Sequence, residues 1–167
     1  MQKVVGSNPI SRFSRMAYTQ TEGRQEILDA LVVSIDEIGI ALANVTAAYE
    51  QLDDGTADRL EQNVFGPIQK AYGMAKRTHA EFAARSGGEG RRFGAPVPPG
   101  ASLKARELIQ QAAQAALRAD EALADLQSEQ SLVEVGDVEL RRGIGEVRAG
   151  LAAVPRQAAE LLRTLGR

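Results

Sequence analysis

The chain has 167 residues, of which 44% are hydrophobic and 25% charged, and its formal net charge is -2. These values suit one soluble globular domain, and they provide no overall attraction to nucleic acid or to an anionic lipid surface. The chain has no cysteine and one histidine, which excludes disulfides, thiolate metal sites and cysteine nucleophiles.

The N-terminal segment differs from the rest of the chain. Residues 1–15 are polar and show no helical period, so we expect residues 1–20 to be a disordered extension or one that is not translated. The run Gly6 to Pro9 can be encoded by GGT-TCG-AAT-CC, which matches the T-arm consensus of transfer RNA genes. On this hypothesis the codon for Met1 lies inside a neighbouring tRNA gene, and translation initiates at Met16.

Neither a signal peptide nor a membrane-spanning segment is predicted. The first residues have no apolar core of the kind that signal peptides carry. The longest uninterrupted apolar run, near Leu31 to Val33, is too short to cross a bilayer. We therefore expect a cytoplasmic protein without a membrane partner. The frequent Ala, Gly and Arg residues are typical of a GC-rich bacterial genome.

Four amphipathic segments follow, and their apolar residues recur at spacings of three and four, the pattern of a helix with one buried face. The period predicts helices at about residues 21–53, 56–86, 102–132 and 137–166. We expect Thr21, Thr56 and Asp137 to cap helix N-termini, and Gly55 to end the first helix in the left-handed conformation. Prolines interrupt two of the patterns, so kinks are predicted at Pro67 and Pro155.

These segments predict an all-α fold, a four-helix antiparallel up-and-down bundle over residues 21–167 with coiled-coil-like packing. Short turns near residues 55 and 136 would make two helical hairpins, and the Gly- and Pro-rich linker 86–100 would join them. The first helix is acidic and the fourth basic. They are either complementary neighbours or two solvated faces.

The sequence contains no recognisable catalytic, cofactor or metal motif. His79 has Lys76 three residues before it and no second histidine to join it, so His-based metal sites and nucleophilic triads are excluded. We interpret His79 as a surface residue. Adjacent acidic residues such as Asp36 and Glu37 diverge on a helix and do not form a catalytic dyad. We therefore predict no enzyme activity and no cofactor.

One basic cluster surrounds the linker and is the candidate partner-contact site. It comprises Arg85, Arg91, Arg92, Phe93, Lys104 and Arg106. An exposed phenylalanine among arginines could dock an acidic protein, a phosphate or single-stranded nucleic acid. The other interpretation, which we favour, is solubilising charge on a mobile loop, because a nucleic-acid surface has a wider basic face and more aromatics.

Three classes of function stay open at this level. The leading hypothesis is a non-enzymatic bundle that acts through protein contacts, as an adaptor or a homo-oligomer. The alanine-rich third helix could form the seam of a dimer. The second class is a small-molecule or enzymatic site between helices or at a dimer interface, framed by Tyr49 and Tyr72. The third is weak nucleic-acid or phosphate binding through residues 85–106.

Overall fold

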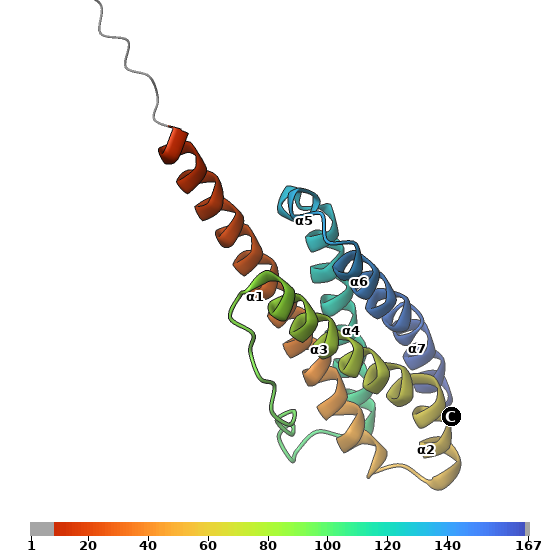
Figure 1. The fold of residues 1–167 in the computed structure, drawn as a ribbon. Coiled ribbons are helices and arrows are strands. Elements are labelled where there is room, and N and C mark those ends of the chain that lie inside the picture. The colour runs from red at the N-terminus through yellow and green to blue at the C-terminus, as the bar shows by residue number, and fades with distance from the viewer. Residues whose placement is uncertain (1–8, 166–167) are drawn as a thin grey trace, which may run out of the picture.

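The protein has an all-α fold. The structure is a computed structural model that describes the backbone of residues 9–165 and the side chains of residues 19–165. Its elements are α1 (Pro9–Tyr49), α2 (Asp54–Leu60), the π-helical turn η1 (Glu61–Phe65), α3 (Gly66–Ser86), α4 (Ala105–Ser128), α5 (Gln130–Val135), α6 (Val138–Leu151) and α7 (Val154–Leu165). The long helices lie side by side in Figure 1, and α1 continues beyond the others at its N-terminal end.

The first helix starts earlier than the sequence pattern predicted. α1 begins at Pro9, so the backbone of residues 9–20 is helical and Thr21 lies inside the helix rather than at its N-cap. The first eight residues of the predicted extension lie outside the described residues. Initiation at Met16 stays a prediction.

The helix ends follow local capping chemistry, although one cap was predicted at the wrong residue. Asp53, not Thr56, caps α2: its carboxylate accepts a hydrogen bond from the backbone N–H of Thr56 at 3.1 Å. Gly55 therefore belongs to the first turn of α2 and is not left-handed. Gly136 is left-handed, with φ 66°, and the adjacent Asp137 caps α6 as predicted.

Both predicted proline interruptions are confirmed. Pro67 lacks the N–H of a regular helix, and the preceding turn η1 widens so that the N–H of Gly66 reaches the carbonyl of Glu61. Pro155 lies at the second position of α7, and residues 152 and 153 separate this helix from α6. Each predicted long helix is thus divided where its proline lies.

The direction of α4 differs from the predicted up-and-down order. A short turn, α2 and η1 connect α1 to α3, and α3 runs antiparallel to α1 (Figure 1). Leu103, two residues before α4, accepts a hydrogen bond from Gln51, two residues after α1, while Arg118 of α4 contacts Glu37 further back along α1. α4 is therefore also antiparallel to α1, and α3 and α4 run in the same direction.

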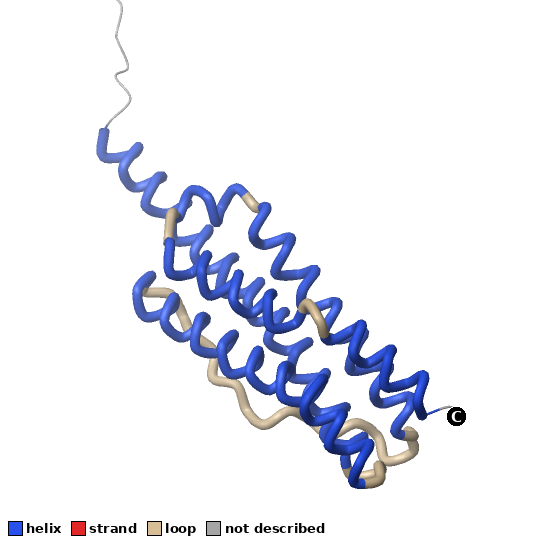
Figure 2. Tube along the Cα trace, turned by 90° about the vertical axis from the view of Figure 1, so that its right-hand side faces the viewer, coloured by secondary structure: helices blue, strands red, loops and turns tan. Residues whose placement is uncertain are grey.

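The linker explains this topology, because it is long enough to return along the molecule. At about 3.1 Å per residue for an extended Pro-rich chain, residues 87–104 can cover more than the ~32 Å length of α3. Figure 2 shows the linker, in tan, running alongside the helices instead of turning tightly. A hairpin turn would have reversed the chain, whereas this crossover restores its direction.

The core lies between α1, α3, α4, α6 and α7. α1 packs against both α3 and α4, and α3 and α4 in turn pack against the α6–α7 pair. Of the two alternatives for the acidic first and basic fourth helices, the structure does not have them as paired neighbours: Asp36 and Glu37 of α1 form ion pairs with Arg91 of the linker and Arg118 of α4. The alanine stripe of α4 is part of the core, with Ala112, Ala115, Ala116 and Ala119 fully buried.

α1 is more apolar than its short uninterrupted runs suggested. From Thr19 to Tyr49 it is long and apolar enough to cross a membrane, whereas the sequence pattern predicted no such segment. Half of its most apolar window is buried inside the fold. A core helix that packs on two sides has the same composition.

Candidate functional site

The six residues of the predicted basic cluster are spread over the length of the linker rather than gathered. At one end Arg85 makes two hydrogen bonds of 3.1 Å to the carboxylate of Asp137. At the other end Arg106 donates to the carbonyl of Leu162 on α7 at 3.0 Å, and the backbone N–H of Lys104 donates to a glutamate in the first turn of α4. These residues stabilise the two ends of the fold.

Arg91 and Phe93 lie together at the middle of the linker, on the surface of α1 and α3. Nη1 of Arg91 is 2.8 Å from Oδ2 of Asp36, and its guanidinium lies 5.2 Å from the centre of the Phe93 ring. Phe93 was predicted to be exposed, but it is partly buried and packs against the core. Arg92, next to it, is exposed. Only Arg91 and Phe93 of the predicted set therefore make one site.

His79 lies beneath this part of the linker, which corrects its interpretation as a surface residue. Its exposed fraction is 1%, and its ring meets the ring of Phe93 edge-on at a centroid distance of 5.2 Å. Nε2 of His79 has no hydrogen-bond partner among the described residues. The sequence spacing indicates this burial, because His79 falls on the same helix face as the buried residues Ile68, Tyr72 and Ala75.

The surroundings of His79 favour its neutral form. Burial is the largest influence and lowers the pKa of His79, and the positive charge of Arg91 lowers it further. The carboxylate of Asp29 on α1 opposes both effects. His79, the only histidine of the chain, therefore lies between α3 and the linker in its neutral form.

Tyr72 holds the linker at a position two helical turns before His79 on α3. Its hydroxyl donates a hydrogen bond of 3.3 Å to the carbonyl of Gly94, and the ammonium of Lys76 lies 4.3 Å from its ring centre. Burial, followed by the charge of Asp36, raises the pKa of the Tyr72 hydroxyl. Tyr72 is thus a neutral donor that holds the linker on α1 and α3.

An open groove of about 280 Å³ lies along this site, between α1, Tyr72 and linker residues 91–97. Among the described residues, no group of three or more His, Cys, Asp or Glu side chains could hold a metal ion. Tyr49, the other predicted ligand-framing tyrosine, lies elsewhere and packs on Phe65 at 6.3 Å. The two tyrosines do not frame one cavity.

A second surface feature is an apolar face beside the groove, which we call the α1 face. Its four members are large apolar side chains with substantial exposed fractions: Val33 (55%) and Ile40 (47%) of α1, Leu117 (46%) of α4 and Val97 (84%) of the linker. Ile40 and Val97 line the same groove. Beside these residues, the ion pairs Arg91–Asp36 and Arg118–Glu37 join α1 to the linker and to α4.

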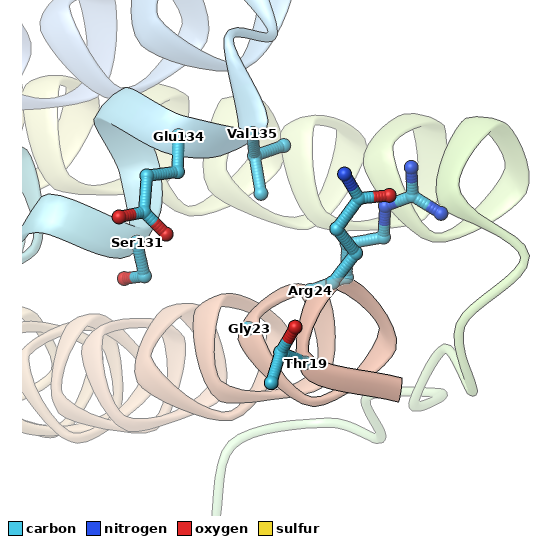
Figure 3. A pocket seen from close by; sticks show the side chains of 7 residues that line it. Thr19, Gly23, Arg24, Ser131, Glu134 and Val135 are labelled. Carbon is cyan, nitrogen blue, oxygen red and sulfur yellow. The ribbon is translucent and has the colours of Figure 1, made fainter. Parts of the chain in front are cut away.

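A further groove of about 310 Å³ separates the N-terminal half of α1 from α5. Figure 3 shows Ser131 and Glu134 of α5 facing Gly23 of α1 across it. Glu134 already accepts a hydrogen bond from Gln130, and Ser131 donates to Glu129. These polar groups therefore serve to hold α5 itself.

Comparison of the chain with models of known protein families, with curated proteins and with solved structures finds no match.

Proposed function

We propose that this chain is a four-helix bundle with one long crossover, and that it is a cytoplasmic, non-enzymatic protein that acts through protein–protein contacts. In this proposal the α1 face is the contact surface. A second copy of the chain is the first partner to test, and an adaptor role with a different protein is the other form of the same proposal.

The observation that carries the proposal is the grouping of exposed apolar side chains on the α1 face. Isolated apolar residues are common on protein surfaces, but a contiguous group edged by charged residues is typical of an interaction site. Here Val33 and Ile40 lie two helical turns apart on α1, and Val97 of the linker lines one groove with Ile40. Leu117 is exposed on α4 next to Arg118, which pairs with Glu37 of α1. The two ion pairs beside these residues would form the polar rim.

The buried alanine stripe of α4 argues for this face over the seam that the sequence suggested. Ala112, Ala115 and Ala119 are 0% exposed within one chain, so they cannot also serve a contact between chains without unfolding. The α1 face needs no such rearrangement. Partner binding there is compatible with the packed core.

The experiment replaces Val33 and Ile40 by glutamate, which places charge at the centre of the proposed interface. We expect the solution mass to fall to that of a monomer, or capture of a specific partner to be lost. Val138→Glu is the matched control, because Val138 is 71% exposed but lies on α6, away from the α1 face. Equal association of wild type, the double variant and the control would contradict the proposal.

A further inference from the structure

Three contacts hold linker residues 90–94 on the helices, one from each of three neighbouring residues. Gly94 accepts the hydrogen bond of Tyr72, Arg91 pairs with Asp36, and Phe93 packs on the ring of His79. The first two of these contacts are partly exposed polar interactions, which contribute little individually. The contact between Phe93 and His79 is the only one of the three that covers a histidine, the side chain that titrates nearest to neutral pH, and His79 is only 1% exposed.

The backbone of the linker closes the space over His79. A Cβ atom added at Gly90 would lie 3.1 Å from Cβ of Ala83 and 3.9 Å from Cε1 of His79. Only a residue without a side chain approaches α3 this closely without displacing its neighbours. Water can therefore reach the imidazole only when residues 90–94 move away.

We infer that residues 90–94 form a pH-sensitive latch, which protonation of His79 releases from α1 and α3. A proton on Nε2 would need an acceptor, and the described residues supply none. Arg91 of the linker would add like-charge repulsion. The carboxylate of Asp29 on α1 favours protonation of His79. The other nearby charged groups already have partners: Asp36 of α1 pairs with Arg91, and the ammonium of Lys76 on α3 lies over the ring of Tyr72.

The direction of the pH dependence follows from the two states. With the latch closed, the pKa of His79 is lowered from 6.5, chiefly by burial. With the latch open, the imidazole is hydrated and its pKa returns toward that value. The open state binds more protons, so the closed state is favoured above pH 6.5 and loses stability as the pH falls below it.

Release of the latch would alter the α1 face. The groove under the linker is lined by Ile35, Gly39 and Tyr72, and also by Ile40 and Val97 of the α1 face. Opening would uncover these side chains and displace Val97. This consequence for partner binding rests on the proposed function, whereas the latch itself does not.

The test uses two features of the chain, its single histidine and its lack of cysteine. Long-range ¹H–¹⁵N spectra of the only imidazole report the protonation of His79 directly. Nitroxides on Val97→Cys and Gln69→Cys report the linker position, since Gln69 lines a groove together with the adjoining prolines Pro96 and Pro98. Both signals are followed between about pH 8 and pH 5, where an imidazole titrates.

We expect the dipolar broadening between the nitroxides to disappear with the same midpoint as protonation of His79, below pH 6.5. His79→Phe keeps a ring against Phe93 but cannot be protonated, so its linker should stay closed at the low-pH end. Protonation of His79 without loss of broadening would overturn the inference, as would release that persists in His79→Phe.

Arg91→Gln gives a second measurement that does not require substitution of His79. It removes both the repulsion and the ion pair to Asp36, so the midpoint should move to higher pH. An unchanged or lower midpoint would contradict the latch. Because neither reporter needs a partner, the latch can fail while the proposed interaction holds, and the reverse is also true.

Discussion

Gly143 and Gly145 are two residues apart on α6 and provide a matched pair of alanine substitutions. A Cβ at Gly143 would lie 2.5 Å from Oγ1, 2.7 Å from Cγ2 and 3.2 Å from Cβ of Thr78 on α3. At Gly145 it would meet nothing within 4 Å. The first position tests the spacing of α3 and α6, and the second measures helix propensity alone.

Rotation of Thr78 cannot relieve the contact. Its two heavy substituents fill two of the three staggered positions on Cβ, and both of those positions clash with the added methyl group. After any rotation at least one of the two positions is still occupied. Helix α3 or α6 must therefore shift.

The magnitudes follow from the balance of two effects. Glycine to alanine in a helix interior gains about 1 kcal/mol of stability, while overpacking costs roughly 1–3 kcal/mol. We expect Gly145→Ala to raise the free energy of unfolding by about 1 kcal/mol. Gly143→Ala should leave it unchanged or lower it by up to about 2 kcal/mol, the difference of the two effects.

Urea denaturation followed by circular dichroism measures the two variants against wild type. Thr78→Ala removes both clashing atoms, so the double variant Gly143→Ala/Thr78→Ala should recover the propensity gain relative to Thr78→Ala alone. If Gly143→Ala stabilises the protein as much as Gly145→Ala does, the close approach of α3 and α6 described above is refuted.

Two further predictions concern charged side chains. Asp137→Ala should lower the free energy of unfolding by about 1 kcal/mol, because the carboxylate caps α6. Burial raises the pKa of Asp137, but hydrogen bonds from Arg85 and the backbone lower it more, so the pKa lies below 3.8 in the folded protein. The stabilisation by this carboxylate is therefore present above pH 3.8 and lost as the pH falls further. Thermal unfolding of both proteins across that pH range checks the loss, and an equal pH dependence in the variant would contradict it. Arg148→Ala should destabilise by about 1 kcal/mol, since Arg148 makes a partly buried ion pair of 2.8 Å with Asp120. Arg142→Ala, which breaks only an exposed pair within α6, should change stability by less than about 0.5 kcal/mol.

Local signals in the sequence were sufficient for most of the helices. Apolar spacing placed the later long helices, and residues that act on their own backbone, such as Asp137, Pro67 and Pro155, marked ends and breaks. The direction of α4 was not available from such signals. It depends on whether the linker turns back or lies along α1 and α3, and that choice is made by contacts with residues distant in sequence, such as Tyr72 and Asp36.

The candidate site was found in part. The predicted basic cluster of six residues includes Arg91 and Phe93, which do lie together, whereas its other members lie apart from them. His79, the buried neighbour of Phe93, was missed, because a lone polar residue is ordinarily placed on the surface. Its position on the buried stripe of α3 was visible in the spacing, but the element that covers it was not, since Phe93 follows α3 by several residues of irregular chain.

The crossover topology also has a consequence for folding. Each hairpin places its apolar faces against the other: α1 packs on α4, and α3 packs on α6. A contact such as Glu37–Arg118 closes a loop of 81 residues. The chain loses the conformational entropy of closing this loop before the contact buries any apolar surface. Neither half of the chain buries its core alone, so fragments divided in the linker should fold only when mixed, with kinetics that depend on their concentration.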